Sequence, residues 1–497
     1  ASTCWHLARR GLRVLGLEQG LIPNHEASFA GLTRAIRLSY AEHPDYVPLL
    51  QGAYKYWEVL EEESGEEILR LTGALYMGPP NGELLNGATL SAKQHGLAHT
   101  LYTHTELQEN WPQFRGPGGM GHSVAGDAPL KWSPESVVWK VSLKGKGQSS
   151  PINWGNRIFL TGGSDNGRER YLSCLDSRSG KLLWSRTVGC DSPERPHRMN
   201  SYATPTCVTD GTRVVAFFGP AGLHCYDLDG EKIWSRKVGD FPGPWGVAAS
   251  PVIVDGMVIQ NCDAEGASSL IALDVSSGDL LWKTARKNKP RGGWSTPVLI
   301  EANGKRELVL NGEFGVRSYD PVKGRELWFC QGFNGRGSPI PDFANGLLYV
   351  VNGKPGDTYA VKPGGSGDVT ESRMAWHAPR KGGRDLPSPA VVGEFLVVVS
   401  MSGLATCYDA ESGKIHWQEH LGLRGEYAPA PIVIDGHVLI QSVYGGKTVV
   451  IKPGRRFDVR GINDLGGDVD EIFRSCLAPI QGNIYARSLS KLYCVGP

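Results

Sequence analysis

Arginine, tryptophan and carboxylate side chains recur along residues 146–474, each time shortly before a proline that opens an apolar segment. A guanidinium binds a carboxylate through paired hydrogen bonds, and an indole ring stacks on a flat ligand. If these segments converge, they form one site for a protein partner or a small anionic ligand. The candidate ligand-binding residues are Gln148, Asn200, Trp245, Arg291, Trp294, Arg336, Arg384, Arg424 and Glu426, accompanied by Lys146, Arg198, Tyr202, Asp385, Glu471 and Arg474. The alternative is that they are solvated loop residues that pair with one another.

The stretch Ala248–Thr284 indicates which element would bring these segments together. Apolar runs alternate with turn residues, and the glycine of the second turn can adopt the positive φ that a tight hairpin needs. Four short strands are predicted, at Val252–Val254, Met257–Asn261, Leu270–Asp274 and Leu280–Lys283. Such a unit cannot bury its apolar face alone, so it requires neighbours of its own kind.

The sequence supplies these neighbours as repeats of the same pattern. Copies begin near Pro151, Pro205, Pro251, Pro297, Pro339, Pro389, Pro431 and Pro479. Matching tryptophans follow at Trp184, Trp234, Trp282, Trp328, Trp376 and Trp417. Their separation of about 41 to 50 residues is typical of propeller blades of four strands each. The seventh copy carries Phe457 near the tryptophan position.

The two ends of the repeat region predict how the ring closes. The eighth copy stops at Tyr493–Val495 without an outer strand, whereas an unmatched strand, Val137–Val141, precedes the first copy. Pairing them completes an eighth blade and leaves no free sheet edge. We therefore predict a mainly β fold: an eight-bladed β-propeller of four-stranded blades over residues 137–497, with a lead-in segment at 111–136. The loops before the innermost strands would then meet at one mouth of the channel.

Cysteine usage favours a structural role. Four of the ten cysteines, Cys174, Cys225, Cys407 and Cys494, hold one repeat position, and Ala272 holds it in the third copy. The position therefore selects a small buried side chain. No Cys-x-x-Cys pair or Cys/His cluster with zinc spacing occurs, so we assign no metal ligands. We also find no nucleophile elbow, and single histidines such as His197 are interpreted as ordinary loop or strand residues.

Composition narrows the class of partner. The 52 basic and 51 acidic residues nearly balance, which gives no electrostatic ground for a nucleic-acid partner. No apolar run approaches the length of a membrane span. The first residues, ASTCWHLARRG, do not have the pattern of a secretory signal, so the compartment is left open.

Residues 1–110 have a different pattern, in which helices and strands alternate. Ser2–Arg10 is predicted as a helix and Leu12–Leu17 as a buried strand that ends at Glu18. Further helices are predicted at Tyr46–Glu63 and Gly82–His95, and a strand pair at Leu69–Met77. The first helix and the strand that ends at Glu18 form the second half of a dinucleotide-binding unit. The glycine-rich loop that would hold the pyrophosphate is missing.

Two short motifs in this region carry a resemblance. Thr33–Tyr40 (TRAIRLSY) and His43–Leu49 (HPDYVPL) resemble the FAD-dependent sarcosine and N-methyltryptophan oxidases, over residues 1 to about 115. The resemblance implies Glu18 as the ribose ligand of FAD, with Arg34 and Arg37 near the flavin and the substrate carboxylate. Because the glycine-rich loop and most of the substrate domain are missing, we expect an inactive fragment of an incomplete α/β FAD-binding domain.

The junction between the two regions contains Trp111-Pro112-Gln113-Phe114-Arg115-Gly116-Pro117. This motif resembles the opening of secreted propeller proteins with pyrroloquinoline-quinone-like (PQQ-like) repeats, and a similar stretch fits the oxidase resemblance. The hypothesis is that the chain is a chimera joined at this shared stretch.

Over residues 111–497 the repeat form Ala-Leu-Asp, Ser-Gly and Leu-Trp resembles the PQQ-like propellers, an architecture of the WD40- and YVTN-like kind. Quinoprotein alcohol and glucose dehydrogenases share it, but the adjacent Cys-Cys pair of the alcohol enzymes does not occur here, and their calcium-ligand and catalytic aspartate stretches are not matched. We therefore expect a non-catalytic binding or interaction scaffold with no catalytic residue assigned. A quinone-dependent dehydrogenase that binds PQQ at the mouth is the alternative, and an FAD-dependent amine oxidase is the third. The propeller resemblance implies a periplasmic or secreted protein.

Overall fold

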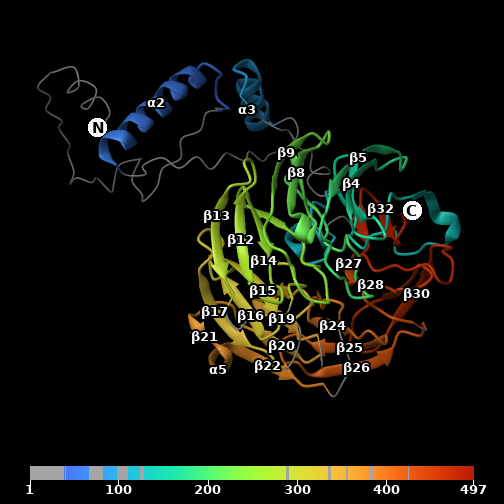
Figure 1. Cartoon of the computed structure of the whole chain (residues 1–497). Helices are drawn as coiled ribbons and strands as arrows, with labels where there is room; N and C mark the ends of the chain where they lie inside the picture. Colours follow the sequence, from blue (N-terminus) through green and yellow to red (C-terminus); the bar gives the residue numbers. More distant parts are fainter. Residues whose placement is uncertain are drawn as a thin grey trace, which may run out of the picture. The chain divides into compact units, whose positions relative to one another are not determined.

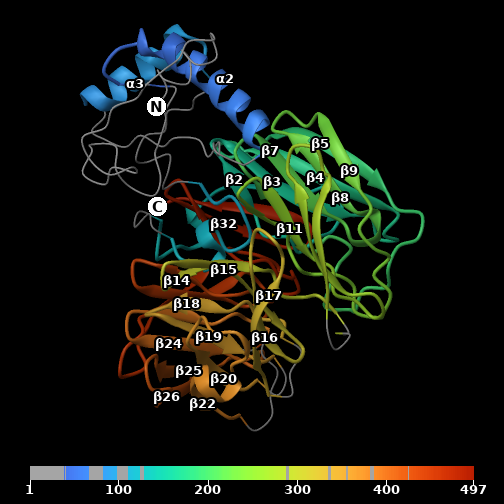
Figure 2. The same cartoon turned by 90° about the vertical axis from the view of Figure 1, so that its left-hand side faces the viewer.

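The computed structural model describes residues 39, 41–65, 82–97, 110–123, 128–286, 290, 292–333, 337–353, 356–380, 386–423 and 425–497. The chain divides into two compact units, residues 1–104 and 105–497. The second unit is a mainly β body in which the blades follow one another in chain order, from green through yellow to red (Figures 1 and 2).

The described part of the first unit contains two helices, α2 (Tyr46–Ser64) and α3 (Glu83–Gln94). Both helices predicted after residue 40 are thus confirmed. Helix α2 ends where Gly65 adopts a φ of 70° and its N–H donates to the carbonyl of Glu61. The predicted helix and strand at residues 2–17 and the strand pair at 69–77 lie outside the described residues. No helix among the described residues is long and apolar enough to span a membrane.

The described part of the second unit forms eight sheets whose main strands pair antiparallel, and in blades 1 to 7 these strands run in chain order from the channel outward. The strands of blades 1 to 4 are β2 (Ile152–Trp154), β3 (Arg157–Gly163), β4 (Glu169–Asp176), β5 (Leu182–Gly189); β6 (Val208–Thr209), β7 (Arg213–Phe217), β8 (Leu223–Asp227), β9 (Lys232–Arg236); β10 (Val252–Val254), β11 (Met257–Asn261), β12 (Ser269–Asp274), β13 (Leu280–Ala285); and β14 (Val298–Ala302), β15 (Lys305–Gly312), β16 (Gly315–Tyr319), β17 (Glu326–Gln331). The four strands predicted within Ala248–Thr284 are therefore confirmed as blade 3.

Blades 5 to 8 complete the ring. Their strands are β18 (Asp342–Ala344), β19 (Leu347–Val351), β20 (Thr358–Val361), β22 (Met374–Ala378); β23 (Ala390–Val392), β24 (Phe395–Val399), β25 (Leu404–Asp409), β26 (Ile415–His420); β27 (Ile432–Ile434), β28 (His437–Gln441), β29 (Lys447–Ile451), β30 (Val459–Asp464); and β31 (Ala478–Ile480), β32 (Asn483–Arg487), β33 (Lys491–Val495), β1 (Val137–Ser142). Short helical turns η1 (Pro117–Gly119), η2 (Pro134–Ser136), η3 (Gly219–Ala221) and α5 (Thr370–Arg373) lie between strands.

Two features modify the regular pattern. Strand β1 pairs antiparallel with β33, with Trp139 opposite Cys494, so the predicted closure of the ring is confirmed. Blade 4 has an additional short strand, β21 (Gly367–Asp368), which belongs to the β20–β22 connection of blade 5 and pairs parallel with β17. Residues 362–373 thus tie blades 4 and 5 together.

Most of the repeated tryptophans join their blade to the next, whereas Trp328 donates from Nε1 to Glu307 of its own blade. Trp184, on the outer strand of blade 1, donates from Nε1 to the carbonyl of Leu228 in blade 2 at 2.9 Å. Its ring covers Gly230, where a Cβ would lie 2.7 Å from the indole. The same contact to the next blade is made by Trp139, Trp234, Trp376 and Trp417. Within each sheet a small residue faces the tryptophan, for example Cys174 opposite Trp184. The four repeat-position cysteines are free and buried, in agreement with the structural interpretation.

Blade 7 departs from this pattern, and the structure corrects the role of Phe457. Gly461, opposite Val450, holds the position that tryptophan holds in the other outer strands. Phe457 instead packs on Trp417 of blade 6, with ring centroids 4.9 Å apart. The reason is topological, because a tryptophan here would need a turn joining the last two strands of blade 8. Those strands, β33 and β1, come from distant parts of the chain and no turn joins them.

The prolines of the repeat do not all hold one structural position. Pro151, Pro251, Pro297, Pro389 and Pro431 directly precede the innermost strand of their blade. Pro205 and Pro339 lie two residues earlier, while Pro479 lies inside β31. The repeat was thus detected correctly, with a register error of two residues in three copies.

Residues 110–123, which contain the Trp-Pro-Gln-Phe-Arg motif, are bound to the propeller. Trp111 exchanges hydrogen bonds with Asn153 of blade 1, and the carbonyl of Pro112 accepts from Thr209 of blade 2. The segment then reaches blade 7, where Val433 donates to the carbonyl of Gly121 and accepts from Ser123. Since these partners belong to innermost strands on different sides of the ring, the segment crosses the channel.

Limited proteolysis is expected to release a stable core that begins near Asn110, the predicted boundary between the oxidase-like fragment (1–110) and the propeller part. The Asn110 side chain accepts a hydrogen bond from the amide of Gly155 at 2.8 Å, and Trp111 follows in the propeller. Trypsin digestion followed by intact-mass measurement locates the boundary. Equal resistance of both parts, or a core that begins after residue 123, would contradict it.

Candidate functional site

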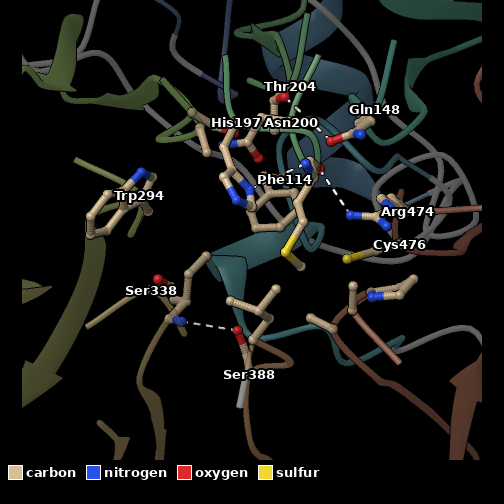
Figure 3. Close-up of a pocket in the computed structure, with 18 of the residues that line it drawn as sticks. Phe114, Gln148, His197, Asn200, Thr204, Trp294, Ser338, Ser388, Arg474 and Cys476 are labelled. Atoms are coloured by element: carbon tan, nitrogen blue, oxygen red, sulfur yellow. Dashed lines mark hydrogen bonds between the residues drawn. The ribbon is translucent and has the colours of Figure 1, made fainter. Parts of the chain in front are cut away.

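A pocket lies at the end of the channel where the innermost strands begin, and we call it the mouth pocket (Figure 3). Its volume is about 170 Å³. It is lined by Phe114, Gln148, His197, Met199, Asn200, Thr204, Trp245, Ala248, Ser250, Trp294, Ser338, Ile340, Leu386, Ser388, Ala428, Pro429, Ala430, Arg474 and Cys476. These residues come from the lead-in segment and from the loop before the innermost strand of every blade. The structure therefore brings these loops together at one mouth of the channel, as predicted.

The wall of the pocket is held by hydrogen bonds that pass from one blade to the next. The amide of Ser150 donates to Thr206 Oγ1 at 2.8 Å, and the amide of Thr206 donates to Ser250 Oγ at 3.0 Å. Equivalent bonds run from Ser250 to Thr296, from Ile340 to Ser388 and from Cys476 to Ser150. Each hydroxyl thus satisfies a buried amide of its neighbour, which fixes the loops relative to one another.

The floor of the pocket is formed by Phe114 of the lead-in segment. The next residue, Arg115, is fully buried and donates from Nη2 to the carbonyls of Met120 and Pro389. Burial lowers the pKa of this guanidinium, and the nearby Asp342 opposes the shift. The lead-in segment therefore fills the channel beneath Phe114, and the mouth pocket is closed on that side.

One side of the pocket is built by the loop of residues 190–207, which connects blades 1 and 2. Buried Arg170 anchors it, donating to Glu194 Oε2 at 2.6 Å and to the carbonyl of Tyr202 at 2.7 Å. Burial raises the pKa of Glu194, although the Arg170 charge acts against this. Between these anchors, the ring of His197 lies 5.2 Å from that of Trp245.

Trp245 and Trp294 form the aromatic part of the pocket. They precede β10 and β14, and their rings meet edge to face, 6.3 Å apart at 88°. Asn200 Nδ2 donates to the carbonyl of Trp245 at 2.7 Å, which ties this aromatic pair to the loop 190–207. Trp294 is seen at one side of the pocket in Figure 3, and Arg474 at the other.

Arg474 provides a positive charge beside the pocket. Its Nη1 donates to the carbonyl of Met199 at 3.1 Å, and its Nη2 donates to Glu426 Oε2 at 3.2 Å. The Arg474 side chain is 11% exposed and that of Glu426 is 41% exposed. Cys476 lies nearby, and burial raises the pKa of its thiol, so it stays protonated at neutral pH. Among the described residues, no group of three or more His, Cys, Asp or Glu side chains is arranged to hold a metal ion.

Of the predicted ligand-binding residues, Gln148, Asn200, Trp245 and Trp294 line the mouth pocket, and Glu426 pairs with one of its lining residues. Their predicted role in ligand binding stays a prediction. Four candidates, Arg291, Arg336, Arg384 and Arg424, lie outside the described residues, as do Glu18, Arg34 and Arg37.

Two accompanying loop residues pair with residues outside the candidate set. Lys146 pairs with Asp165, and Glu471 accepts hydrogen bonds from Lys491 and Tyr493. The sequence interpretation missed Phe114 and His197 as lining residues. His197 could have been found from its position in an unusually long inter-blade loop, whereas no repeat position identifies Phe114.

The ring of blades matches a known protein family. The family model described as outer membrane protein assembly factor BamB matches residues 128–243, 168–331 and 316–458. Together these matches span more than half of the chain. The chain belongs to this PQQ-like repeat family. The predicted resemblance over the propeller is therefore confirmed.

Solved structures agree with the PQQ-like fold. BamB from Moraxella catarrhalis aligns with a TM-score of 0.53 and 14% identity, covering 73% of this chain and 97% of BamB. A europium-containing methanol dehydrogenase aligns with a TM-score of 0.60 and 11% identity, covering 77% of this chain and 90% of the dehydrogenase. At these identities, the alignments show the propeller fold alone.

The N-terminal part matches a second family. The model described as FAD dependent oxidoreductase covers residues 1–129. N-methyl-L-tryptophan oxidase from Yersinia pestis (strain Pestoides F) is 32% identical over 113 residues, which are 23% of this chain and 30% of the oxidase. The enzyme from Yersinia pseudotuberculosis (serotype O:1b) matches to the same extent. The chain thus spans about a third of the length of these relatives, and the predicted oxidase resemblance is confirmed for this part.

Proposed function

We propose that this PQQ-like propeller is a non-catalytic scaffold whose mouth pocket receives a side chain or small group of a binding partner. The observation that carries the proposal is that loops from all eight blades meet around one pocket that Phe114 closes from below. With a volume of about 170 Å³, it is smaller than the roughly 300 to 1,000 Å³ usual for sites that enclose a drug-sized ligand. It suits one inserted group of a larger partner.

The lining groups support binding more than proton transfer. The Arg474 guanidinium binds its neighbours Met199 and Glu426 through hydrogen bonds, and the raised pKa of Cys476 leaves its thiol a poor nucleophile at neutral pH. Aromatic rings, side-chain amides and a guanidinium are the side chains that binding surfaces use to fix a partner. Membership of a family described as an assembly factor supports a protein as the partner.

A quinone-dependent dehydrogenase is the second candidate, favoured by the presence of Trp245 and Trp294 where a flat cofactor would stack. Two observations count against it: the two indoles stand at 88° to each other, so a flat cofactor can stack on only one of them, and Phe114 also lines the pocket. For FAD, the matching segment spans 30% of the oxidase relative, so we propose no amine oxidase activity.

A titration with PQQ and Ca²⁺ tests the proposal against the dehydrogenase. The expected result is no saturable quenching of tryptophan fluorescence, and no reduction of a dye acceptor in the presence of alcohols or aldoses. The Trp245→Phe/Trp294→Phe double variant and a Trp154→Phe control, which alters a tryptophan at the far end of β2, should behave like the wild type. Saturable quenching lost only in the double variant, together with dye reduction, would establish the dehydrogenase instead.

A further inference from the structure

Arg474 lies in an environment that leaves it available to a ligand. Its partner Glu426 is 41% exposed, so water and salt screen that ion pair, and exposed pairs of this kind contribute little to stability. The described residues that line the mouth pocket include neither aspartate nor glutamate. A ligand carboxylate can therefore replace Glu426 on the guanidinium without meeting a negative charge inside the pocket.

A second buried cation, Arg487, lies beside residues 147–149 of the pocket wall. Arg487 donates to the carbonyls of Ser149 and Thr161, at 2.9 and 2.7 Å, and to Ser149 Oγ. Burial lowers the pKa of Arg487 to about 9, so it remains mostly charged at neutral pH. These acceptors carry no formal charge, and no carboxylate within ion-pair distance of Arg487 is found in the described part of the chain. Because its charge is not compensated there, it favours an anion in the neighbouring pocket.

The aromatic groups lie at the other side of the pocket. Trp294 precedes blade 4 and Arg474 precedes blade 8, so the two come from opposite sides of an eight-bladed ring, as Figure 3 shows. Phe114 lies between them on the floor. A ligand that contacts both ends therefore needs an anionic group at one end and a flat apolar group at the other.

We propose that the mouth pocket binds a carboxylate attached to a flat apolar group, with the carboxylate on Arg474 and the apolar group against Trp245 and Trp294. The inference rests on the proposed binding function and names the chemistry of the group that is bound. Either a small aromatic acid or the C-terminus of a peptide that ends in an aromatic residue provides this chemistry.

Calorimetric titration of the full chain with indole-3-acetate and with the neutral indole-3-acetamide tests the proposal. The wild type should bind the acid at least tenfold more tightly than the amide. Arg474→Gln should reduce this preference to less than twofold, whereas Arg306→Gln should keep it. Arg306 is a suitable control because it also pairs with a carboxylate, that of Asp255, in turns on the opposite face of the propeller.

Arg474 also donates to the carbonyl of Met199, so Arg474→Gln could weaken binding by disturbing the loop 190–207. A second variant distinguishes this effect from the loss of the carboxylate-binding group. Glu426→Gln leaves the guanidinium in place and removes its competing partner, so the affinity for the acid should rise two- to fivefold. A peptide that ends in tryptophan, with a free or an amidated C-terminus, forms the second ligand series. Preference for the acid in either series supports the proposal and identifies the source of the carboxylate.

Equal binding of acid and amide in both series, or a preference that survives in Arg474→Gln, would overturn this inference. Neither result would restore a catalytic role, because quinone-dependent dye reduction is measured separately. Saturable binding of the neutral amide, lost in the Trp245→Phe/Trp294→Phe variant, would retain the binding function while refuting its carboxylate specificity.

Discussion

Replacing Trp376 by alanine is expected to lower the free energy of unfolding by about 3–5 kcal/mol, the usual cost of removing a large buried aromatic side chain. The indole is 9% exposed, stacks on Tyr408 at 6.0 Å and donates to the carbonyl of Ala410 at 3.0 Å. Since these partners belong to blade 6, the substitution opens the junction between blades 5 and 6. Guanidinium denaturation followed by far-ultraviolet circular dichroism measures the loss.

Phenylalanine substitutions distinguish the contribution of the aromatic ring to stability from that of the hydrogen bond. Trp376→Phe keeps an aromatic ring but leaves the Ala410 carbonyl unpaired, and an unmade hydrogen bond of this kind costs about 1–3 kcal/mol. Trp282→Phe is the matched control, because the buried Nε1 of Trp282 has no partner in the described structure. We expect the smaller loss for Trp282→Phe. Equal losses at the two positions would show that the inter-blade hydrogen bonds do not contribute to stability.

Gly116→Ala is expected to destabilise the propeller by about 2–4 kcal/mol, as the sum of overpacking and the strain of a backbone conformation, φ 71° and ψ −160°, that essentially only glycine adopts. Gly116 has a φ of 71°, and a Cβ at this position would lie 2.4 Å from the indole of Trp111. Trp111 is buried and its backbone is bound to Asn153, so its ring has little room to move aside.

Gly118→Ala is the control for this substitution. Gly118 also has a positive φ, 69°, but its ψ of −8° lies near the left-handed helical region, and a Cβ there meets no atom within 4 Å. The control should therefore lose only the part of the unfolding free energy that comes from backbone strain, about 1–2 kcal/mol. The same denaturation measurement applies, and the interpretation fails if both alanines cost the same.

The ring of blades could be predicted from the sequence because its signals are local and repeated. Most turn glycines, such as Gly230 and Gly278, meet the tryptophan of the preceding blade, and small residues such as Cys174 face that tryptophan across the sheet, so one contact produces three sequence features at a fixed spacing. Gly461 could not be assigned correctly in the same way. Its identity depends on the absence of a turn in blade 8, whose outer strand β1 comes from a distant part of the chain.

The mouth pocket was predictable only in part, for a related reason. Gln148 and Trp294 were found because each precedes an innermost strand, and the fold places every such loop at the same end of the channel. Phe114 reaches the pocket through a segment that crosses the ring, and His197 reaches it through the fold of a long loop anchored by Arg170. Contacts of this kind arise from tertiary packing, which the repeat does not encode.

The pairing of β1 with β33 also determines how this architecture could be rewired. A short Ser-Gly link between Val495 and Val137, with the chain opened instead at an exposed turn such as Asp255-Gly256, would give a circular permutant in which blade 8 is a continuous hairpin unit and blade 3 is divided between the two ends of the chain. The new link would supply blade 8 with the turn that it does not have at present. Gly461 would then face a glycine turn, and tryptophan would become the favoured residue at that position. The glycine at position 461 in blade 7 thus reflects the fact that the propeller begins and ends in blade 8, where β1 pairs with β33.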